Sequence, residues 1–394
     1  MGNAHKKKNT GIVTIEKGTV EDNKGKKYVV DFVGDNDDFV NISYFQEKKK
    51  DESSIKALLK QNKDEIYDIC FINNYSHLLV ACNKGNLYVY KRKINGKSNL
   101  IFEELILFKP HNDTIIQILK LQSGHILTLS SDSSAKILKI EIDINGILYE
   151  NQKRCDEIQT LLESRESYNY NSAIELISGN LIISQAYFIN FFSKKNYDNI
   201  NDNIEFQLTK KIFTNSDNIF FAEIDNKTIV ATQISNNSLD FYRINDYSVI
   251  KKVENIEFYN DQNSMCLISK DTLALSGNNG SIYLINTIMK QLFSLIHLDN
   301  CQKITCIKSI DIEHMIIGCS NSDNYDVVIY KKIGNNFEEI KRKEKVHNEI
   351  IKDIKLITLS ISKNKNHFCK NYNVITIGSD HKVKLILNTL MKIN

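Results

Sequence analysis

The sequence predicts an all-β protein that forms a single seven-bladed β-propeller of four-stranded antiparallel blades. A seven-residue motif, in which polar or turn residues are followed by apolar residues at alternating positions, recurs seven times. Examples are KGNLYVY at 84–90 and NGSIYLI at 279–285. The copies end at Tyr90, Leu138, Phe192, Tyr242, Ile285, Tyr330 and Ile386. Successive copies are therefore 43 to 56 residues apart, and a period of roughly 40–50 residues is typical of propeller blades.

The seven-residue motif is predicted to form the third strand of each repeat, and two apolar strands precede it. First strands are predicted at 66–72, 114–121 and 303–310, among others. Second strands are predicted at 77–82, 125–130, 180–185, 228–233, 272–277, 314–319 and 373–378. Both kinds are rich in β-branched residues and are bounded by polar or glycine turns, as strands should be. The second strands are almost continuously apolar, which indicates burial between neighbouring sheets.

A fourth, outer strand should follow the seven-residue motif at the rim of each blade. Segments 104–108, 205–213, 249–256, 291–296 and 337–343 fit this position. They are more polar than the inner strands, and charged residues on an exposed edge discourage unwanted pairing. Between the second and third repeats, residues 142–171 exceed the usual spacer, and EIQTLLES within them predicts a helical turn.

The last repeat ends near Leu387 and leaves too little chain for its own outer strand. We therefore expect an N-terminal strand, at 27–33 or 39–45, to complete the last blade and close the ring without an open edge. Residues 53–61 predict a short helix that joins this strand to the first blade. Removal of residues 1–50 should then lower the thermal stability markedly.

The predicted domain organisation is a basic tail at 1–10 followed by the propeller at 11–394. The repeats span roughly 66–93, 111–141, 172–194, 218–244, 263–287, 303–332 and 347–388. The least repeat-like regions are 142–171 and 361–372, which are either partner-binding loops or neutral insertions.

Two repeats resemble the WD-repeat (WD40) family in their polar residues. In that family a His precedes the first strand, a Ser or Thr lies in the second strand, and an Asp lies in the following turn. The matching structural polar sets are His111, Ser130 (or Ser131) and Asp132, and His347, Thr376 and Asp380. The tryptophan that closes the family's third strand is replaced throughout, since the chain has no Trp. No subfamily follows from these residues.

These His, hydroxyl and Asp sets have the residue types of a catalytic triad. A structural role explains them better, because a buried Asp needs donors and the set occurs twice without a nucleophile-elbow context. We expect no catalytic residue, no metal site and no cofactor. The cysteines lack the paired spacing of a zinc site. Their places in apolar strands predict reduced thiols in a cytoplasmic protein.

The net charge and the apolar content of the chain indicate which classes of partner are unfavourable. The formal net charge is +3, with 42% hydrophobic and 25% charged residues. That charge is too small to favour nucleic acid, which binds strongly basic domains. No apolar run is long enough to predict a transmembrane helix.

The N-terminal sequence MGNAHKKKNTG predicts an alternative function, which is attachment to a membrane. Gly2 is a candidate for N-myristoylation, although Lys6 stands where the usual pattern has Ser or Thr. An acyl chain together with the Lys6–Lys8 cluster would suffice for membrane attachment. The other interpretation is a solvated tail.

The sequence therefore predicts a non-catalytic protein-interaction scaffold that displays loops on a rigid propeller. The WD-repeat resemblance implies the same role, as an adaptor in a multi-protein complex. The alternative is a membrane-associated adaptor, with the same propeller anchored through Gly2 and the basic N-terminus. An enzyme that uses the central channel is a third hypothesis without supporting residues.

Overall fold

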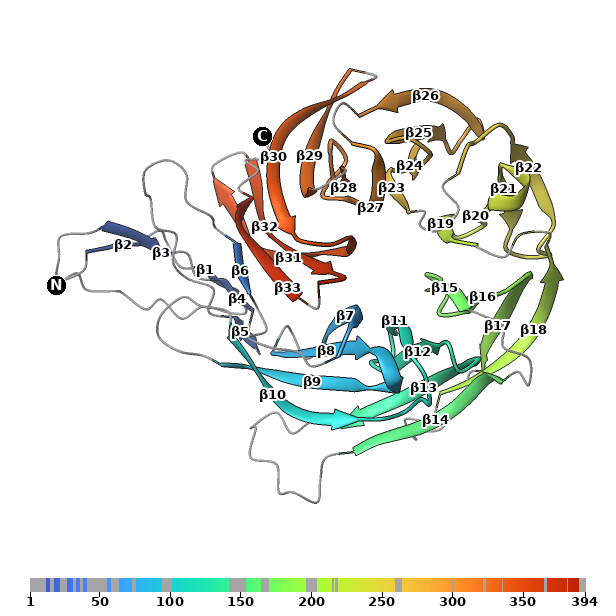
Figure 1. Ribbon diagram of the computed structural model, residues 1–394, viewed down its shortest axis with the longest axis horizontal. Coiled ribbons are helices and arrows are strands. Elements are labelled where there is room, and N and C mark those ends of the chain that lie inside the picture. The colour runs from blue at the N-terminus through green and yellow to red at the C-terminus, as the bar shows by residue number, and fades with distance from the viewer. Residues whose placement is uncertain are drawn as a thin grey trace.

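The computed structural model describes strand backbone at 12–14, 18–21, 27–30, 33–35, 38–40 and 55–57. From residue 64 to residue 389 it describes all residues except 73–75, 94–100, 142–153, 164–169, 196–203, 215, 217–218, 259–263, 299–300, 322–323, 335, 365–366 and 381. These residues form seven four-stranded antiparallel sheets arranged in a ring (Figure 1). The predicted all-β, seven-bladed propeller is confirmed.

Four consecutive strands make up each of the first six blades. Blades 1 and 2 comprise β7 (Ile66–Ile72), β8 (His77–Cys82), β9 (Leu87–Lys93), β10 (Ile101–Phe108), β11 (Ile115–Lys120), β12 (Ile126–Ser130), β13 (Ser134–Glu141) and β14 (Arg154–Glu163). Blades 3 and 4 comprise β15 (Tyr170–Glu175), β16 (Leu181–Gln185), β17 (Phe188–Lys195), β18 (Glu205–Phe213), β19 (Phe221–Asp225), β20 (Thr228–Gln233), β21 (Ser238–Arg243) and β22 (Val249–Val253). Blades 5 and 6 comprise β23 (Met265–Ser269), β24 (Thr272–Ser276), β25 (Ser281–Asn286), β26 (Gln291–His297), β27 (Lys303–Ser309), β28 (His314–Ser320), β29 (Tyr325–Ile333) and β30 (Asn336–His347).

The seventh blade contains β31 (Ile351–Asn364), β32 (His367–Gly378), β33 (Lys382–Thr389) and β6 (Ile55–Ala57). Two short 3-10 turns, η1 (Asn83–Gly85) and η2 (Ile234–Asn236), lie between second and third strands. Five further strands form two small sheets apart from the blades: β1 (Ile12–Thr14), β4 (Val33–Asp35) and β5 (Asp38–Val40), and β2 (Gly18–Glu21) with β3 (Lys27–Val30).

The core lies between adjacent blades. Every residue of the second strands β8, β12, β16, β20 and β24 is buried, because each such strand has neighbours on both faces of its sheet. The junction of the last and first blades is built in the same way. There Ile375 and Ile377 of β32 share one apolar cluster with Leu78 and Val80 of β8. This burial joins the two ends of the repeat array and makes the ring one cooperative unit.

The fourth strand of the last blade is β6, which pairs antiparallel with β33 through Ile55, Lys56 and Ala57. The predicted donors of this strand were 27–33 and 39–45, and that assignment is wrong. Residues 27–30 pair with β2, and 38–40 pair with β4. The predicted helix at 53–61 is also wrong at 55–57, where the chain is extended; residues 58–61 lie outside the described residues.

The long spacer after the second repeat also differs from the expectation. Residues 157–163 of the segment EIQTLLES, predicted as a helical turn, lie in β14, the outer strand of blade 2, and Ser164 lies outside the described residues. Pairing with β13 outweighs the weak helical preference of its Leu and Glu residues. Segment 361–372 is largely strand as well, because β31 and β32 extend into it as a long hairpin.

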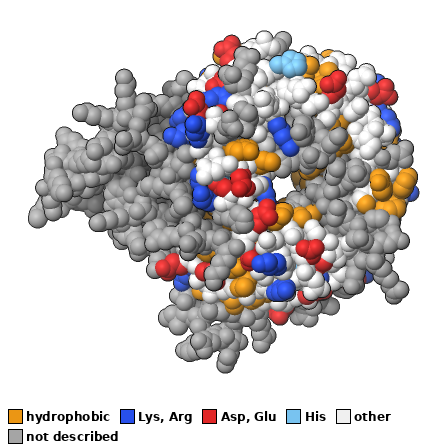
Figure 2. Space-filling view, in the orientation of Figure 1, with side chains coloured by type: hydrophobic (Ala, Val, Ile, Leu, Met, Phe, Trp, Pro, Cys, Tyr) orange, Lys and Arg blue, Asp and Glu red, His pale blue; other side chains and the backbone are white. Residues whose placement is uncertain are grey.

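We name the two faces of the ring by their loops. The connection face carries the blade-to-blade connections and the turns between second and third strands. The opposite face carries the turns between first and second strands and between third and fourth strands. An opening remains at the centre of the ring, and both acidic and basic side chains lie around it (Figure 2).

Candidate interaction surfaces and the residues that hold them

Adjacent first strands are joined by a repeated side-chain-to-backbone hydrogen bond. The Ile118 amide of blade 2 donates to Asp68 Oδ2 of blade 1 at 2.9 Å. The Ile307 amide of blade 6 donates to Ser264 Oγ of blade 5, also at 2.9 Å. Gln117 makes the same link from blade 2 to blade 3, where its amide group both donates to and accepts from the Ala173 backbone. Buried backbone groups need such partners, and here they come from the neighbouring blade.

Asp68 and Gln117 lie at bulges in their strands. The register shifts between Ile66 and Asp68 in β7, and between Ile115 and Gln117 in β11. A bulge re-aims a side chain and bends its strand. This explains how polar side chains within apolar runs can reach across to the next blade.

At the two junctions of blade 7, with blade 6 and with blade 1, ion pairs also link the first strands. Lys308 of blade 6 contacts Asp353 of blade 7 at 3.1 Å. Lys355 of blade 7 contacts both Asp353 and Asp68 of blade 1, at 2.9 Å each. We call these four residues the closure ladder. Lys352 adds a further link from blade 7 to blade 1, at 2.6 Å from Glu65 and 3.6 Å above the ring of Tyr67.

The surroundings shift the pKa values of the ladder in different directions. Burial opposes the charge on Lys355, but Asp353 and Asp68 outweigh it and raise the pKa of the ammonium group. Burial also opposes ionisation of Asp353, yet two neighbouring lysines hold the pKa of that carboxyl below its usual range. Asp68 has one lysine, and burial raises its pKa. The charge at the blade 7 to blade 1 junction therefore depends on Lys355, which contacts both carboxyl groups.

On the connection face, His111 lies between a threonine and an aspartate. His111 Nε2 is 2.8 Å from Thr128 Oγ1, and His111 Nδ1 is 3.1 Å from Asp132 Oδ2 and 2.9 Å from Ser134 Oγ. The Asn112 amide donates to Asp132 Oδ2 at 2.9 Å. This set joins the connection into blade 2 to the β12–β13 turn of the same blade.

Ser130, the hydroxyl named from the sequence, does not take the place beside the ring. Its Oγ donates to the Asp113 carbonyl at 3.0 Å and accepts from the Asp132 amide at 3.1 Å. Ser130 thus holds the same turn from a different side, while Thr128 contacts His111. Aligning LTLSSD of this repeat with ITIGSD of the last one would have placed Thr128 opposite Thr376.

The last blade brings together all three residues of its set. His347 Nε2 is 2.8 Å from Thr376 Oγ1, and His347 Nδ1 is 2.8 Å from Asp380 Oδ1. Gly378 makes room for this pair, since a Cβ atom there would lie 2.1 Å from His347 Nδ1. In both sets the imidazole links a threonine of the second strand to the aspartate of the following turn, so each set holds that turn in place.

Two turns are held by aspartates that the sequence analysis missed. Asp64 lies two residues before β7, and it accepts hydrogen bonds from Tyr88 at 2.7 Å and from Asn86 at 2.6 Å. In blade 6, Asp326 contacts Arg342 at 3.0 Å and accepts from the Lys345 amide at 3.0 Å. Divergent repeats therefore keep a buried carboxylate but change its partners.

Burial disfavours the charged form of His111 and lowers its pKa below the ordinary value near 6.5, against the attraction of Asp132. Between that lowered pKa and about pH 6.5 the unfolded chain binds more protons than the folded one. The free energy of unfolding should therefore decrease as the pH is lowered from 7 through this window. His77 has a lowered pKa by burial as well and contributes with the same sign. Urea unfolding at several pH values measures the slope.

The variant His111→Gln tests how much of this pH dependence comes from His111. At pH 7 we expect a loss of about 2 kcal/mol, because Thr128 and Asp132 lose a buried partner. Its unfolding free energy should also depend less on pH than that of the wild type. The exposed His297, whose Nδ1 is 3.0 Å from Ser281 Oγ, provides the control, and His297→Gln should keep the wild-type slope. Equal slopes in all three proteins would contradict the assignment.

One pair of cysteines departs from the expectation of reduced thiols, whereas five described cysteines are free: Cys70, Cys82, Cys155, Cys266 and Cys306. Cys301 and Cys319 form a disulfide, with Cα atoms 5.6 Å apart. It joins the connection into blade 6 to the end of β28. Burial raises the pKa of the Cys155, Cys266 and Cys306 thiols to about 12, so these three are poor nucleophiles. A cytoplasmic location, which was argued from reduced cysteines, stays a prediction.

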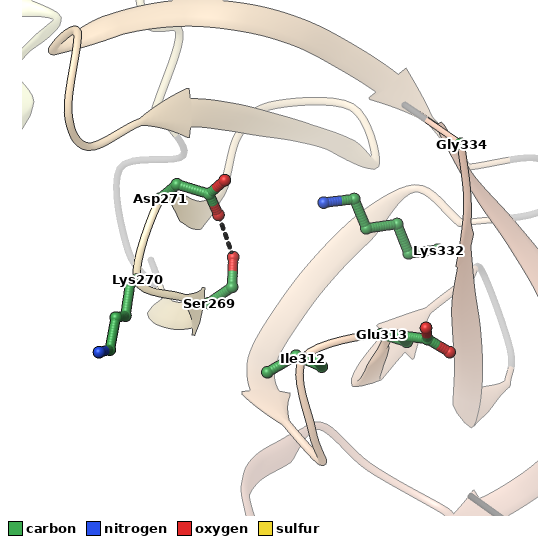
Figure 3. Close-up of a pocket in the computed structure, with 7 residues that line it drawn as sticks. All are labelled: Ser269, Lys270, Asp271, Ile312, Glu313, Lys332 and Gly334. Atoms are coloured by element: carbon green, nitrogen blue, oxygen red, sulfur yellow. Dashed lines mark hydrogen bonds between the residues drawn. The ribbon is translucent and has the colours of Figure 1, made fainter. Parts of the chain in front are cut away.

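On the opposite face, the turns of blades 5 and 6 surround an open depression (Figure 3). It is lined by Ser269, Lys270, Asp271, Ile312, Glu313, Lys332 and Gly334. Lys332 extends toward Asp271, while Ile312 lies at the edge and is 67% exposed. Nearby turns of the same two blades expose further apolar side chains: Ile288 (72%), Met289 (67%) and Ile333 (48%). We call these four residues with the depression the blade 5–6 surface.

Three further expectations concern metal sites, membrane spans and the N-terminus. Within the part of the chain that the structure describes, no three His, Cys, Asp or Glu residues are grouped to hold a metal ion. No helix among these residues is long and apolar enough to cross a membrane. Gly2 and Lys6–Lys8 lie outside the described residues.

The comparisons with known proteins agree with the architecture. No family model matches the sequence, and no curated protein matches it significantly. Three solved structures each align with 84% of this chain. They are Sqt1 of Saccharomyces cerevisiae (TM-score 0.58, 10% identity, 98% of that chain), U3-55K (0.59, 10%, 97%) and the WD40 repeats of RRP9 (0.58, 11%, 96%). At this identity the likeness is one of fold, and the chain has the seven-bladed fold of WD40-repeat propellers.

Proposed function

We propose that this protein is a non-catalytic interaction scaffold whose partner protein docks on the blade 5–6 surface. The observation that carries the proposal is the exposure of Ile288, Met289 and Ile312, each about two-thirds or more exposed. Single exposed apolar residues are common, but several in adjoining turns indicate a binding site.

The chemistry of the surface fits a protein partner. Apolar side chains lie beside Lys332 and Asp271, which supply charges of both signs. Protein interfaces combine an apolar centre with a polar rim in this way. The depression is open to solvent, and small-molecule sites are enclosed and bury most of their ligand.

The rigidity of the propeller supports the same role. Hydrogen bonds between first strands, the closure ladder and the histidine sets fix the turns relative to one another. A surface that is already ordered loses little conformational entropy when a partner binds. The proposed mechanism is therefore display of fixed turns, with no chemical step.

The substitution Ile312→Asp tests the proposal. A charge at this position should remove the co-purifying partner from native lysate, because an unpaired carboxylate would be buried in the complex. The matched control is Ile177→Asp, since Ile177 lies in the corresponding turn of blade 3 and is 70% exposed. Partner recovery should fall at least tenfold for Ile312→Asp and stay unchanged for Ile177→Asp. Equal recovery with both variants would contradict a site on blades 5 and 6.

The membrane-associated adaptor is the second proposal, and it depends on Gly2 and the Lys6–Lys8 cluster of the sequence. Vesicle cosedimentation of protein from the native host distinguishes the two. A Gly2→Ala variant that sediments with anionic vesicles as well as the wild type would remove the lipid anchor from consideration. The intact mass of the protein from its native host shows directly whether the acyl group is present.

A further inference from the structure

The outer strand of blade 5 differs from the other outer strands. β26 has the sequence QLFSLIH and contains no Lys, Arg, Asp or Glu. Each of the other six outer strands described, β6, β10, β14, β18, β22 and β30, carries at least one such residue. Charge on an edge strand prevents it from pairing with another chain. Only β26 lacks this protection among the described blades.

Its side chains are also apolar and exposed. Leu292 is 39% exposed, Phe293 is 41% exposed and Leu295 is 43% exposed. Ile340, which is 48% exposed, lies on β30, and β30 contacts β26. β26 ends its sheet, with β25 as its neighbour on one side (Figure 1). Its second edge therefore presents backbone donors and acceptors beside apolar side chains.

The order of residues in β26 is close to symmetric about Ser294. Phe293 is the extra residue of a bulge in the pairing with β25. In an antiparallel pair of two copies centred on Ser294, Phe293 would lie nearest to Leu295, and Leu292 would lie nearest to Ile296. The terminal Gln291 would face His297. Apolar residues thus meet apolar residues, polar residues meet polar residues, and no like charges oppose each other. A strand that complements itself in this way suits the two-fold interface of a homodimer.

We propose that β26 is a self-association surface, through which two copies of this chain pair edge to edge. The two β26 strands would run antiparallel across a two-fold axis at Ser294, joining two blade 5 sheets into one eight-stranded sheet. The contact is small, so the dimer should dissociate on dilution. It lies on the rim of the ring and leaves the blade 5–6 surface to a partner.

Sedimentation of the full chain over a concentration series tests the dimer. The wild type should shift from the monomer mass of 45.4 kDa toward twice that mass as concentration rises. Leu295→Lys should weaken dimerisation at least tenfold, because it places a charge opposite Phe293 in both halves of the interface. The matched control is Leu208→Lys on β18, where Leu208 is 44% exposed, and it should dimerise as the wild type does.

Crosslinking tests the register. Residues opposite each other in antiparallel strands have Cα atoms roughly 4.5–5.5 Å apart, which a disulfide can span. Ser294→Cys should therefore form a covalent dimer under mild oxidation, whereas Leu208→Cys should stay at the wild-type background. A wild type that remains monomeric at all concentrations would overturn the proposal. So would equal dissociation by the two lysine variants, or equal crosslinking by the two cysteine variants.

Discussion

The Lys355→Met substitution is expected to lower the free energy of unfolding by about 2 kcal/mol. Breaking a fully buried ion pair costs roughly 3–5 kcal/mol, because the remaining charge stays buried without its partner. Lys355 contacts Asp68 and Asp353 at 2.9 Å each, and its side chain is 30% exposed. Partial solvent access reduces the cost below that of a fully buried pair. Urea or thermal unfolding of the full chain measures it.

The pH dependence identifies the cause of this loss. Burial already raises the pKa of Asp68, and removal of its lysine should raise that pKa further. A carboxyl whose folded pKa is raised binds more protons in the folded state than in the unfolded one. The stability gap between Lys355→Met and the wild type should therefore narrow as the pH is lowered.

The control substitution is Lys382→Met, also in the last blade. Lys382 lies 3.9 Å from Asp380 and its side chain is 49% exposed. Exposed pairs of this kind contribute between 0 and about 1 kcal/mol, so this variant should unfold nearly as the wild type does. A similar loss in both variants, or a gap for Lys355→Met that is independent of pH, would show that the closure ladder does not stabilise the ring.

The sequence was sufficient to predict the architecture because its apolar period is long and repeated. Each second strand is a short apolar run, and only burial between blades accommodates seven such runs. The outer strands at 104–108, 205–213, 249–256, 291–296 and 337–343 were also located, as β10, β18, β22, β26 and β30. Their fixed place in the repeat made them recognisable, including β26, which carries no Lys, Arg, Asp or Glu.

The errors arose where long-range pairing decides the local structure. Residues 55–57 and 154–163 contain Leu, Ala, Lys and Glu residues that favour a helix in isolation. Pairing with β33 and β13 makes both segments extended. The disulfide was missed for a related reason, since its two cysteines meet only because the connection into blade 6 runs beside the end of β28.

The links between blades were missed although a sequence signal existed. Asp68, Gln117 and Asp353 each interrupt an apolar run at the same place, in IYDI, IIQI and IKDI. A polar residue repeated inside a buried strand requires a partner. The partners of the histidine sets are local and can be found within one repeat, whereas the partners of these residues come from the neighbouring repeat.

Deletion of residues 1–62 is expected to destabilise the ring by about 3 kcal/mol, whereas deletion of residues 1–50 should change its stability by less than about 1 kcal/mol. The longer deletion removes β6 and with it the three residue pairs to Ile386, Leu385 and Lys384. Cross-strand pairs and their hydrogen bonds each contribute roughly 0.5–1 kcal/mol. The longer deletion should also aggregate with rising concentration, because β33 becomes an open edge. Thermal unfolding and light scattering of both proteins provide the comparison.

Two proline variants of the full chain test the same strand without shortening it. In an antiparallel edge strand, successive amides point alternately toward the neighbouring strand and away from it. Of Ile55→Pro and Lys56→Pro, one therefore removes an amide that bonds to β33, and the other removes an outward amide. The two should differ in stability, and the more damaging one should approach the longer deletion. If deletion of 1–50 alone were as damaging as deletion of 1–62, the closing strand would come from the earlier segments at 27–33 or 39–45 after all.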